Sequence, residues 1–252
     1  MTLEDDCSCV RSTKKQDYPR SGTLFKNMNK PLEGLTKKLK DYVDLNESLY
    51  YYIVRTLDYQ EKQILQKGSA PNFQGGIISL CTCKHWMRTF SNILNQESVW
   101  IAGLTSINLI PKNRYNFLFY LMRVEKGFRF KSHQEAWHNI PKEIRSKKIA
   151  SRHLFGDLFK PKPQIVDEFD AESYFEPVEG HPHQKLTKEG IPIWHKDIQQ
   201  YYDKPYVLLF GNPEFSFLWN KEPRFYYSSE KKLTQGQRYS SIGDFIKNLT
   251  KL

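Results

Sequence analysis

The chain changes character at Leu49-Tyr50-Tyr51-Tyr52-Ile53-Val54-Arg55, where a run of aromatic and β-branched residues follows a polar stretch. These residue types favour strands, and an apolar run of this length is typical of a buried strand. Runs of the same kind follow it and predict strands at 77–81, 99–104, 116–124, 206–211 and 215–219. We expect the core domain to begin at the first run.

Helical patterns are fewer than strand patterns. Leu32, Leu35 and Leu39 repeat on one helical face after Pro31, and Ser241-x-x-Asp244 resembles a capping box before an apolar face. We predict helices from Pro31 and over 241–252, with weaker signals at 58–67, 132–137 and 142–150. Strands in runs with few helices between them favour an α+β fold over a doubly wound sheet.

The chain divides into three parts. The first thirty residues lack an apolar period, so we expect a flexible leader over 1–30 and an accessory helix in 31–48. A single α+β domain then covers 49–252, with a polar insertion around 160–195.

The basic charge is concentrated in the middle of the sequence. The 252 residues hold 38 Lys and Arg against 28 Asp and Glu, a net charge of +10, and residues 49–165 alone hold 18 basic and 7 acidic side chains. Such a segment attracts polyanions, of which nucleic acid is the commonest in a cell. A solvated basic surface without a partner is the alternative interpretation.

Several classes of protein lose their usual signatures. The longest apolar run, Phe117 to Met122, is too short to cross a bilayer, and the acidic start is unlike an export signal. We therefore expect a cytoplasmic protein that has no membrane partner. Phosphate-binding, dinucleotide-binding and serine-hydrolase glycine motifs are lacking, so we predict no cofactor.

Metal binding is a hypothesis that the spacing argues against. Cys7 and Cys9, like Cys81 and Cys83, are separated by one residue, whereas structural zinc pairs are normally two to four residues apart. A further possible ligand set comprises His181, His183 and His195. A proline between two of these histidines is more typical of a loop, so we predict no metal site.

The stretch from Pro71 to Arg88 holds most of the candidate binding residues. Paired glycines let backbone approach a ligand, amides pair with base edges, cations hold phosphate, and aromatic rings stack on bases. The paired glycines are Gly75 and Gly76, and the amide is that of Asn72. The cations are Lys84 and Arg88, and the aromatic rings are Phe73 and Trp86. The plainer interpretation is a turn followed by a strand, with Trp86 in the core.

Five segments in order resemble the second type of nucleotide modification associated domain. They are Tyr52-Ile53-Val54-Arg55, Ala70 to Gly76, Ser79 to Lys84 with Arg88, Trp100-Ile101-Ala102-Gly103 and Phe119 to Val124. The sequence departs from the family pattern at Glu97-Ser98 and at Leu158-Phe159. Members of that family, found in phage and bacterial genomes, are predicted to act in systems that make or handle modified DNA bases.

The same progression is similar to PUA-like barrels of the EVE and ASCH kind. This likeness implies a small, strongly bent or closed mixed β-sheet with peripheral helices, whose mouth holds a flipped or modified base. Trp100 and Arg123 join the predicted ligand-binding residues on this basis. The implied partners are DNA or a modified nucleotide, together with other proteins of a DNA-modification system.

We therefore expect a nucleic-acid or nucleotide binding module associated with DNA base modification. One alternative is an enzyme acting on a modified nucleotide or base, with His153 or Asp157 as the acid or base. A second alternative is a basic interaction or immunity protein that binds an acidic partner.

Overall fold

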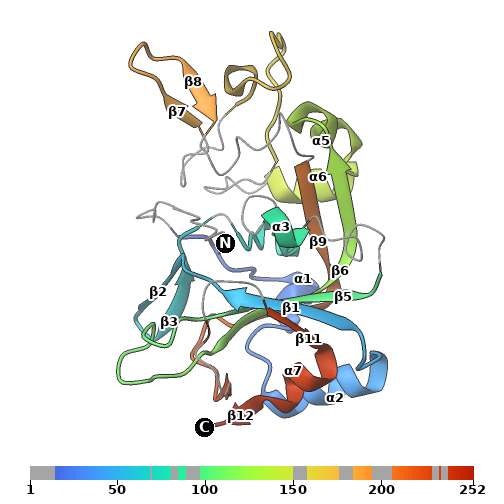
Figure 1. Cartoon of the computed structure of the whole chain (residues 1–252), viewed down its shortest axis with the longest axis vertical. Coiled ribbons are helices and arrows are strands. Elements are labelled where there is room, and N and C mark those ends of the chain that lie inside the picture. The colour runs from blue at the N-terminus through green and yellow to red at the C-terminus, as the bar shows by residue number, and fades with distance from the viewer. Residues whose placement is uncertain are drawn as a thin grey trace, which may run out of the picture.

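A six-stranded mixed sheet forms the centre of the protein (Figure 1). The computed structural model describes residues 15–68, 70–80, 85–88, 97–149, 158–175, 184–194, 206–228, 233 and 238–252. The strand order is β11-β1-β5-β6-β9-β4, in which only β1 and β5 are parallel. The strands are β1 (Ser48–Ile53), β4 (Ser79–Leu80), β5 (Val99–Leu104), β6 (Leu118–Phe130), β9 (Tyr206–Leu218) and β11 (Arg238–Ser241). The predicted α+β class is confirmed.

The two long strands β6 and β9 extend the sheet beyond β5. β5 pairs with β6 only as far as Arg123, whereas Lys126–Phe130 pair with β9 alone. The β6–β9 register shifts between these halves, and such bulges turn a strand. The two strands predicted at 206–211 and 215–219 are therefore one irregular strand. In the part of the chain that the structure describes, the sheet is open, with β11 and β4 at its edges, and no closed barrel is present.

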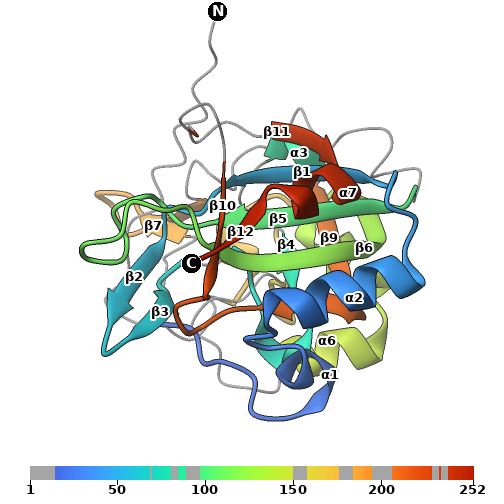
Figure 2. The same cartoon turned by 90° about the horizontal axis from the view of Figure 1, so that it is seen from below.

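Helices cover both faces of the sheet (Figure 2). α2 (Leu32–Tyr42) and α7 (Ile242–Lys247) pack on one face, and α1 (Gly22–Lys26) and α3 (His85–Arg88) pack on the other. α5 (His133–Asn139) and α6 (Lys142–Ile149) lie beside the upper halves of β6 and β9. The helices predicted after Pro31 and in 132–137 and 142–150 are confirmed. None of the helices in the described ranges has both the length and the apolar character needed to cross a membrane.

The predicted helix at 58–67 is wrong. This segment is a hairpin of β2 (Leu57–Gln60) and β3 (Gln63–Gln66). The two residues between the strands, Glu61 and Lys62, both adopt positive φ angles, as a two-residue hairpin turn requires. The polar residues of this segment suggested a helix, whereas the segment forms a strand pair that buries Ile64 and Leu65.

The predicted helix over 241–252 is correct only in its first half. Ser241 Oγ accepts a hydrogen bond from the Asp244 backbone N–H at 3.0 Å, which confirms the predicted cap. The helix ends at Lys247, and the chain continues as β12 (Leu249–Lys251), which pairs with β10 (Phe225–Tyr227). A cross-strand partner therefore replaces the last turns of the expected helix.

Part of the segment expected to be a loose leader is packed onto the domain. In the described residues 15–30, Leu24 lies in the core and Gln16 is buried. Gln16 Nε2 donates to Gly68 O at 2.5 Å and to Pro71 O at 3.0 Å. This segment therefore supports the loop that begins at Pro71.

The region of the expected insertion carries a small aromatic cluster. It includes η2 (Ala171–Ser173) and the hairpin of β7 (Gln184–Leu186) and β8 (Pro192–Trp194). Phe159, Tyr174 and Trp194 surround the buried imidazole of His133 on α5. Burial lowers the pKa of His133 to about 3, so this histidine is neutral at physiological pH.

Candidate functional site

A hollow of about 610 Å³ lies against the glycine-rich loop 71–76, and we call it the glycine-loop pocket. Residues 17–23 form one wall and residues 73–77 form another, with Lys147 of α6 and Pro213 of β9 completing the lining. The volume is within the range of small-molecule sites. Four segments that are distant in sequence therefore meet at this pocket.

A buried lysine fastens the loop to the fold. The ammonium group of Lys148 on α6 is surrounded by oxygens and donates to Asn72 Oδ1 at 2.9 Å, Ile77 O at 2.6 Å and Ser79 Oγ at 2.6 Å. A buried charge is stable only where such acceptors replace water. Lys148 therefore ties the glycine-rich loop and β4 to α6.

Asn72 builds the turn of the loop. Its backbone N–H and C=O pair with Ser79 at 2.9 and 2.7 Å, and its Oδ1 accepts from Gln74 N at 3.0 Å. The side chain is buried and does not line the pocket. The amide that was expected to meet a base edge thus shapes the loop instead.

The two glycines have different roles. Gly75 and Gly76 lie in η1 (Gln74–Gly76) with φ of +67° and +73°, which favours glycine at both positions. A Cβ at Gly75 would lie 2.3 Å from the backbone oxygen of Lys147, whereas a Cβ at Gly76 would meet nothing within 4 Å. Gly75 therefore allows α6 to approach, and Gly76 leaves open backbone at the pocket.

Gln74 brings a buried polar atom to the pocket. The residue lines the hollow and is 3% exposed, and its Oε1 has no hydrogen-bond partner among the described residues. An unsatisfied buried acceptor costs about 1–3 kcal/mol. A ligand N–H or O–H that reaches this oxygen would remove that cost.

Charged and aromatic side chains form the rim. Arg20, Lys147 and Asp17 are exposed there, giving two cations and one anion. The Tyr18 ring stacks on Phe73 at 4.9 Å, and its hydroxyl donates to Ile64 O at 2.5 Å. Burial raises the pKa of Tyr18, so its ring stays neutral and contributes apolar surface.

Trp100 and Arg123 form a separate cluster around Glu47. Trp100 Nε1 donates to Glu47 Oε2 at 2.6 Å, and Arg123 donates to both carboxylate oxygens at 3.0 and 2.5 Å. Trp100 on β5 and Arg123 on β6 are cross-strand partners. In the sheet, β9 lies between β6 and β4, so this pair is separated from the loop that precedes β4. The structure therefore does not bring these two predicted residues to the glycine-loop pocket.

Phe73 and Arg88 are both buried. Phe73 lines the pocket but is buried between Tyr18 and Phe119, so its faces are already covered. Arg88 is 2% exposed and donates to the backbone oxygen of Val207. Of the predicted binding residues, the pocket brings together Phe73, Gly75 and Gly76.

Other predicted residues lie outside the described residues. These are Lys84, the Trp86 side chain, His153, Asp157, Cys7, Cys9, Cys81, Cys83, His181, His183 and His195. Within the part that is described, no three His, Cys, Asp or Glu side chains gather as a metal site would require.

Three residues of the pocket lining, Gln74, Arg20 and Lys147, and the buried Lys148 behind the loop were missed in the sequence. Gln74 lies within the predicted glycine-rich loop. A sequence does not show that its side-chain oxygen is buried without a hydrogen-bond partner. Arg20 falls in the expected leader, and Lys147 and Lys148 fall in the helix predicted at 142–150. Nothing in the sequence distinguishes the buried Lys148 from the exposed Lys147.

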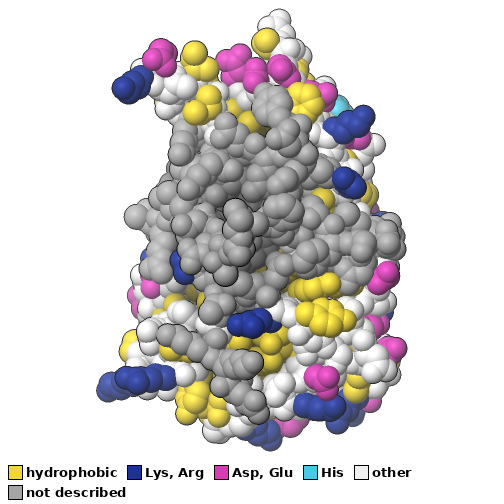
Figure 3. Space-filling model, viewed as in Figure 1, with side chains coloured by type: hydrophobic (Ala, Val, Ile, Leu, Met, Phe, Trp, Pro, Cys, Tyr) yellow, Lys and Arg dark blue, Asp and Glu magenta, His cyan; other side chains and the backbone are white. Residues whose placement is uncertain are grey.

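Basic side chains do not gather into one patch on the face shown in Figure 3. There the described Lys and Arg side chains stand apart, with Asp and Glu between them.

No family model, curated protein or solved structure matches the chain. The resemblance to nucleotide modification associated domains therefore stays a prediction.

Proposed function

We propose that the protein binds a nucleotide, or a base of a nucleic acid, in the glycine-loop pocket. The observation that carries this proposal is that Gln74, a residue of the lining of a hollow rimmed by Arg20 and Lys147, has a buried Oε1 without a partner among the described residues. A buried acceptor beside exposed cations suits a ligand that is polar and hydrogen-bonding at one end and anionic at the other.

The amide of Gln74 complements the edge of a nucleobase. A glutamine amide presents an acceptor beside a donor, and base edges present donors beside acceptors. The open backbone at Gly76 and the neutral Tyr18 and Ile77 surfaces suit the flat, partly apolar body of a base. The proposed pose therefore places the base at Gln74.

The phosphate lies at the rim in this pose. Arg20 and Lys147 are exposed and long enough to reach a phosphate while the base occupies the hollow. Guanidinium and ammonium groups both bind phosphate through charge-assisted hydrogen bonds.

The wider role that fits this pocket is a module associated with DNA base modification. The sequence resemblance and the positive middle segment support that role, and the PUA-like character of the sheet belongs to the same proposal. The function needs no catalytic group, since amides, backbone and aromatic surfaces are sufficient to read a base.

Binding to matched oligonucleotides tests the proposal. Two otherwise identical strands, one plain and one with hypermodified pyrimidines of the phage type, are compared by fluorescence anisotropy at several salt concentrations. A preference for the modified strand that survives moderate salt supports a base-reading pocket. Equal binding that salt abolishes would reduce the interaction to general electrostatics.

A variant series locates the site. Gln74→Leu should weaken nucleotide binding about tenfold, because it removes the only buried acceptor in the described lining that lacks a partner. Gln60→Leu, in the exposed part of β2, is the matched control. Unchanged binding in Gln74→Leu would place the ligand elsewhere.

A further inference from the structure

Two more hollows continue from the glycine-loop pocket along the surface. A middle hollow of about 490 Å³ shares Asp17, Tyr18, Pro19 and Arg20 with it. A distal hollow of about 510 Å³ shares Asn29 and Lys221 with the middle one. Because each hollow shares lining residues with the next, the three are neighbours along the surface, and we call this series of hollows the groove.

The groove is basic along its length. Its cations are Lys147 and Arg20 at the glycine-loop pocket, Lys15 in the middle, and Lys30, Lys221, Arg224 and Lys251 at the distal end. Its acidic side chains are Asp17, Glu33 and Glu222. The groove therefore carries an excess of positive charge beyond the first pocket.

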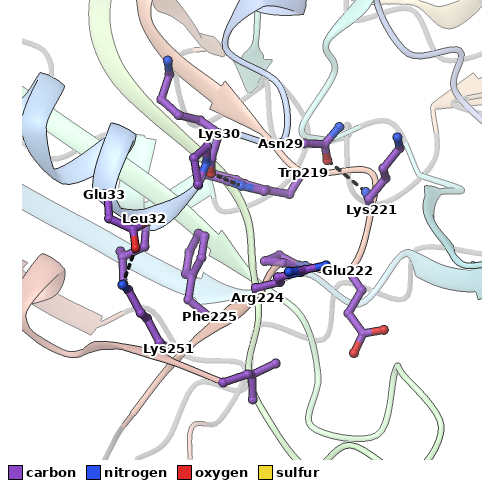
Figure 4. A pocket seen from close by; sticks show the side chains of 13 residues that line it. Asn29, Lys30, Leu32, Glu33, Trp219, Lys221, Glu222, Arg224, Phe225 and Lys251 are labelled. Atoms are coloured by element: carbon purple, nitrogen blue, oxygen red, sulfur yellow. Dashed lines mark hydrogen bonds and ion pairs between the residues drawn. The ribbon is translucent and has the colours of Figure 1, made fainter.

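The two distal acids differ in their partners, since Glu33 has an ion pair and Glu222 has a hydrogen bond from a neutral amide. Glu33 is paired with Lys251, and Glu222 accepts a hydrogen bond from Asn113 Nδ2 at 2.5 Å. Among the described residues, no ion pair involves Lys30, Lys221 or Arg224. Figure 4 shows Lys30 and Lys221 on either side of the Trp219 indole. These cations remain available to an anion in the groove.

An exposed aromatic ring stands in the middle hollow. Phe25 lines it and is 50% exposed, although α1 buries the neighbouring Leu24 completely. A large apolar ring in water beside cations such as Lys15 and Arg20 is the arrangement that holds single-stranded nucleic acid, because bases stack on aromatic rings.

We infer that the groove binds a single-stranded nucleic acid, with one base in the glycine-loop pocket and the following nucleotides along the middle and distal hollows. This inference rests on the proposed function for the first base. A single strand fits because stacking on Phe25 and entry into a pocket both need unpaired bases. The cations distributed along the groove provide partners for the phosphates of such a strand.

The test measures binding by the full chain to a mononucleotide and to labelled oligothymidylates of increasing length. Affinity should rise with length until the strand fills the groove and then level off. The dependence of log Kd on log salt should steepen by about 0.7 for each phosphate held. Oligouridylates in parallel distinguish RNA from DNA as the source of the strand.

Charge removal at the distal hollow tests the path. The Lys30→Gln, Lys221→Gln double variant should weaken long strands and reduce the salt slope by about 1.4, while mononucleotide binding is unchanged. Phe25→Ala should weaken long strands about tenfold. Lys37→Gln, Lys40→Gln removes two exposed lysines of α2 outside the groove and is the matched control.

The outcomes separate this inference from the proposed function. Mononucleotide binding that depends on Gln74 without any gain from length would overturn the groove and leave the pocket standing. Length-dependent binding that depends on Lys30 and Lys221 but not on Gln74 would support the groove and overturn the base pocket. Tighter binding of duplex than of single strand, or of an acidic peptide than of either, would overturn the inference.

Discussion

Lys148 Nζ and Asn72 Oδ1 lie 2.9 Å apart, and this hydrogen bond joins α6 to the glycine-rich loop across 76 residues of sequence. The same ammonium group holds Ile77 and Ser79, so one buried cation organises the loop and the first residue of β4.

Lys148→Met should destabilise the fold by about 3 kcal/mol, because it removes a buried cation from its hydrogen-bond network and leaves the oxygens around it without their donor. Urea unfolding followed by circular dichroism measures the change. Lys147→Met is the matched control, since Lys147 is exposed on the same helix and its exchange should change stability by less than about 0.5 kcal/mol. Equal stability of the two variants would contradict the role of Lys148.

Gln74→Leu should stabilise the ligand-free protein by about 1 kcal/mol while it weakens nucleotide binding. The substitution replaces a buried acceptor that has no partner in the described structure with an apolar group of similar size. Thermal unfolding and anisotropy on the same samples measure both effects. A loss of stability together with a loss of binding would instead indicate a structural role.

Gly75→Ala should cost more stability than Gly76→Ala. Both positions have positive φ, which costs a non-glycine residue about 1–2 kcal/mol, but only the Cβ at Gly75 would collide with the Lys147 backbone. We expect a loss of about 3 kcal/mol or more at Gly75 and about 1 kcal/mol at Gly76. Denaturant midpoints of the two variants test this order, which equal losses would contradict.

His133 should make the fold sensitive to mild acid. Its folded pKa of about 3 is below the ordinary value of 6.5, so below pH 6.5 the unfolded chain takes up a proton that the folded chain does not. The free energy of unfolding should therefore be highest above pH 6.5 and fall by about 1.4 kcal/mol per pH unit as the pH decreases toward 5.

His133→Phe should reduce this pH dependence, because a phenyl ring keeps the contacts with Phe159, Tyr174 and Trp194 but does not titrate. Urea unfolding at pH 7.5, 6 and 5 gives the slope. His138→Gln removes an exposed imidazole from the same helix and serves as the control. A wild-type slope in His133→Phe would show that other groups cause the acid sensitivity.

Arg123→Gln should lower stability without changing nucleic-acid affinity. The exchange leaves the Glu47 carboxylate, whose side chain is 9% exposed, without its bidentate partner, at a cost of about 2 kcal/mol. Arg129→Gln, exposed further along β6, is the control for the lost charge. Weaker oligonucleotide binding in Arg123→Gln alone would bring Arg123 back into the binding site.

The sequence predicted the strands of the sheet better than it predicted the site. Val99–Leu104 forms a strand with the predicted bounds, because an uninterrupted apolar run suits burial on both faces. The β2–β3 hairpin was missed because Glu61 and Lys62 adopt a conformation that favours glycine or asparagine, so its turn left no local signal.

The site was harder to predict because residue type does not determine exposure. Asn72, Phe73 and Arg88 are suited to ligand binding by chemistry, yet tertiary packing buries all three. Gln74 has ordinary chemistry and becomes a candidate only because its oxygen is buried in the lining of a pocket. Such facts depend on long-range packing and require the structure.

The position of β1 also has a consequence for how the chain is made. Its two neighbours are β5 and β11, so Tyr50 pairs with Ile101 on one side and with Tyr239 on the other. During synthesis, β1 leaves the ribosome with both of its edges unpaired. One edge stays unpaired until the residues of β11, which ends at Ser241, have been translated. Unpaired strand edges promote aggregation, and distant pairings form slowly. Nascent chains that are arrested before β11 has been made should therefore bind chaperones. Chains that are arrested after β11 has been made should no longer bind them.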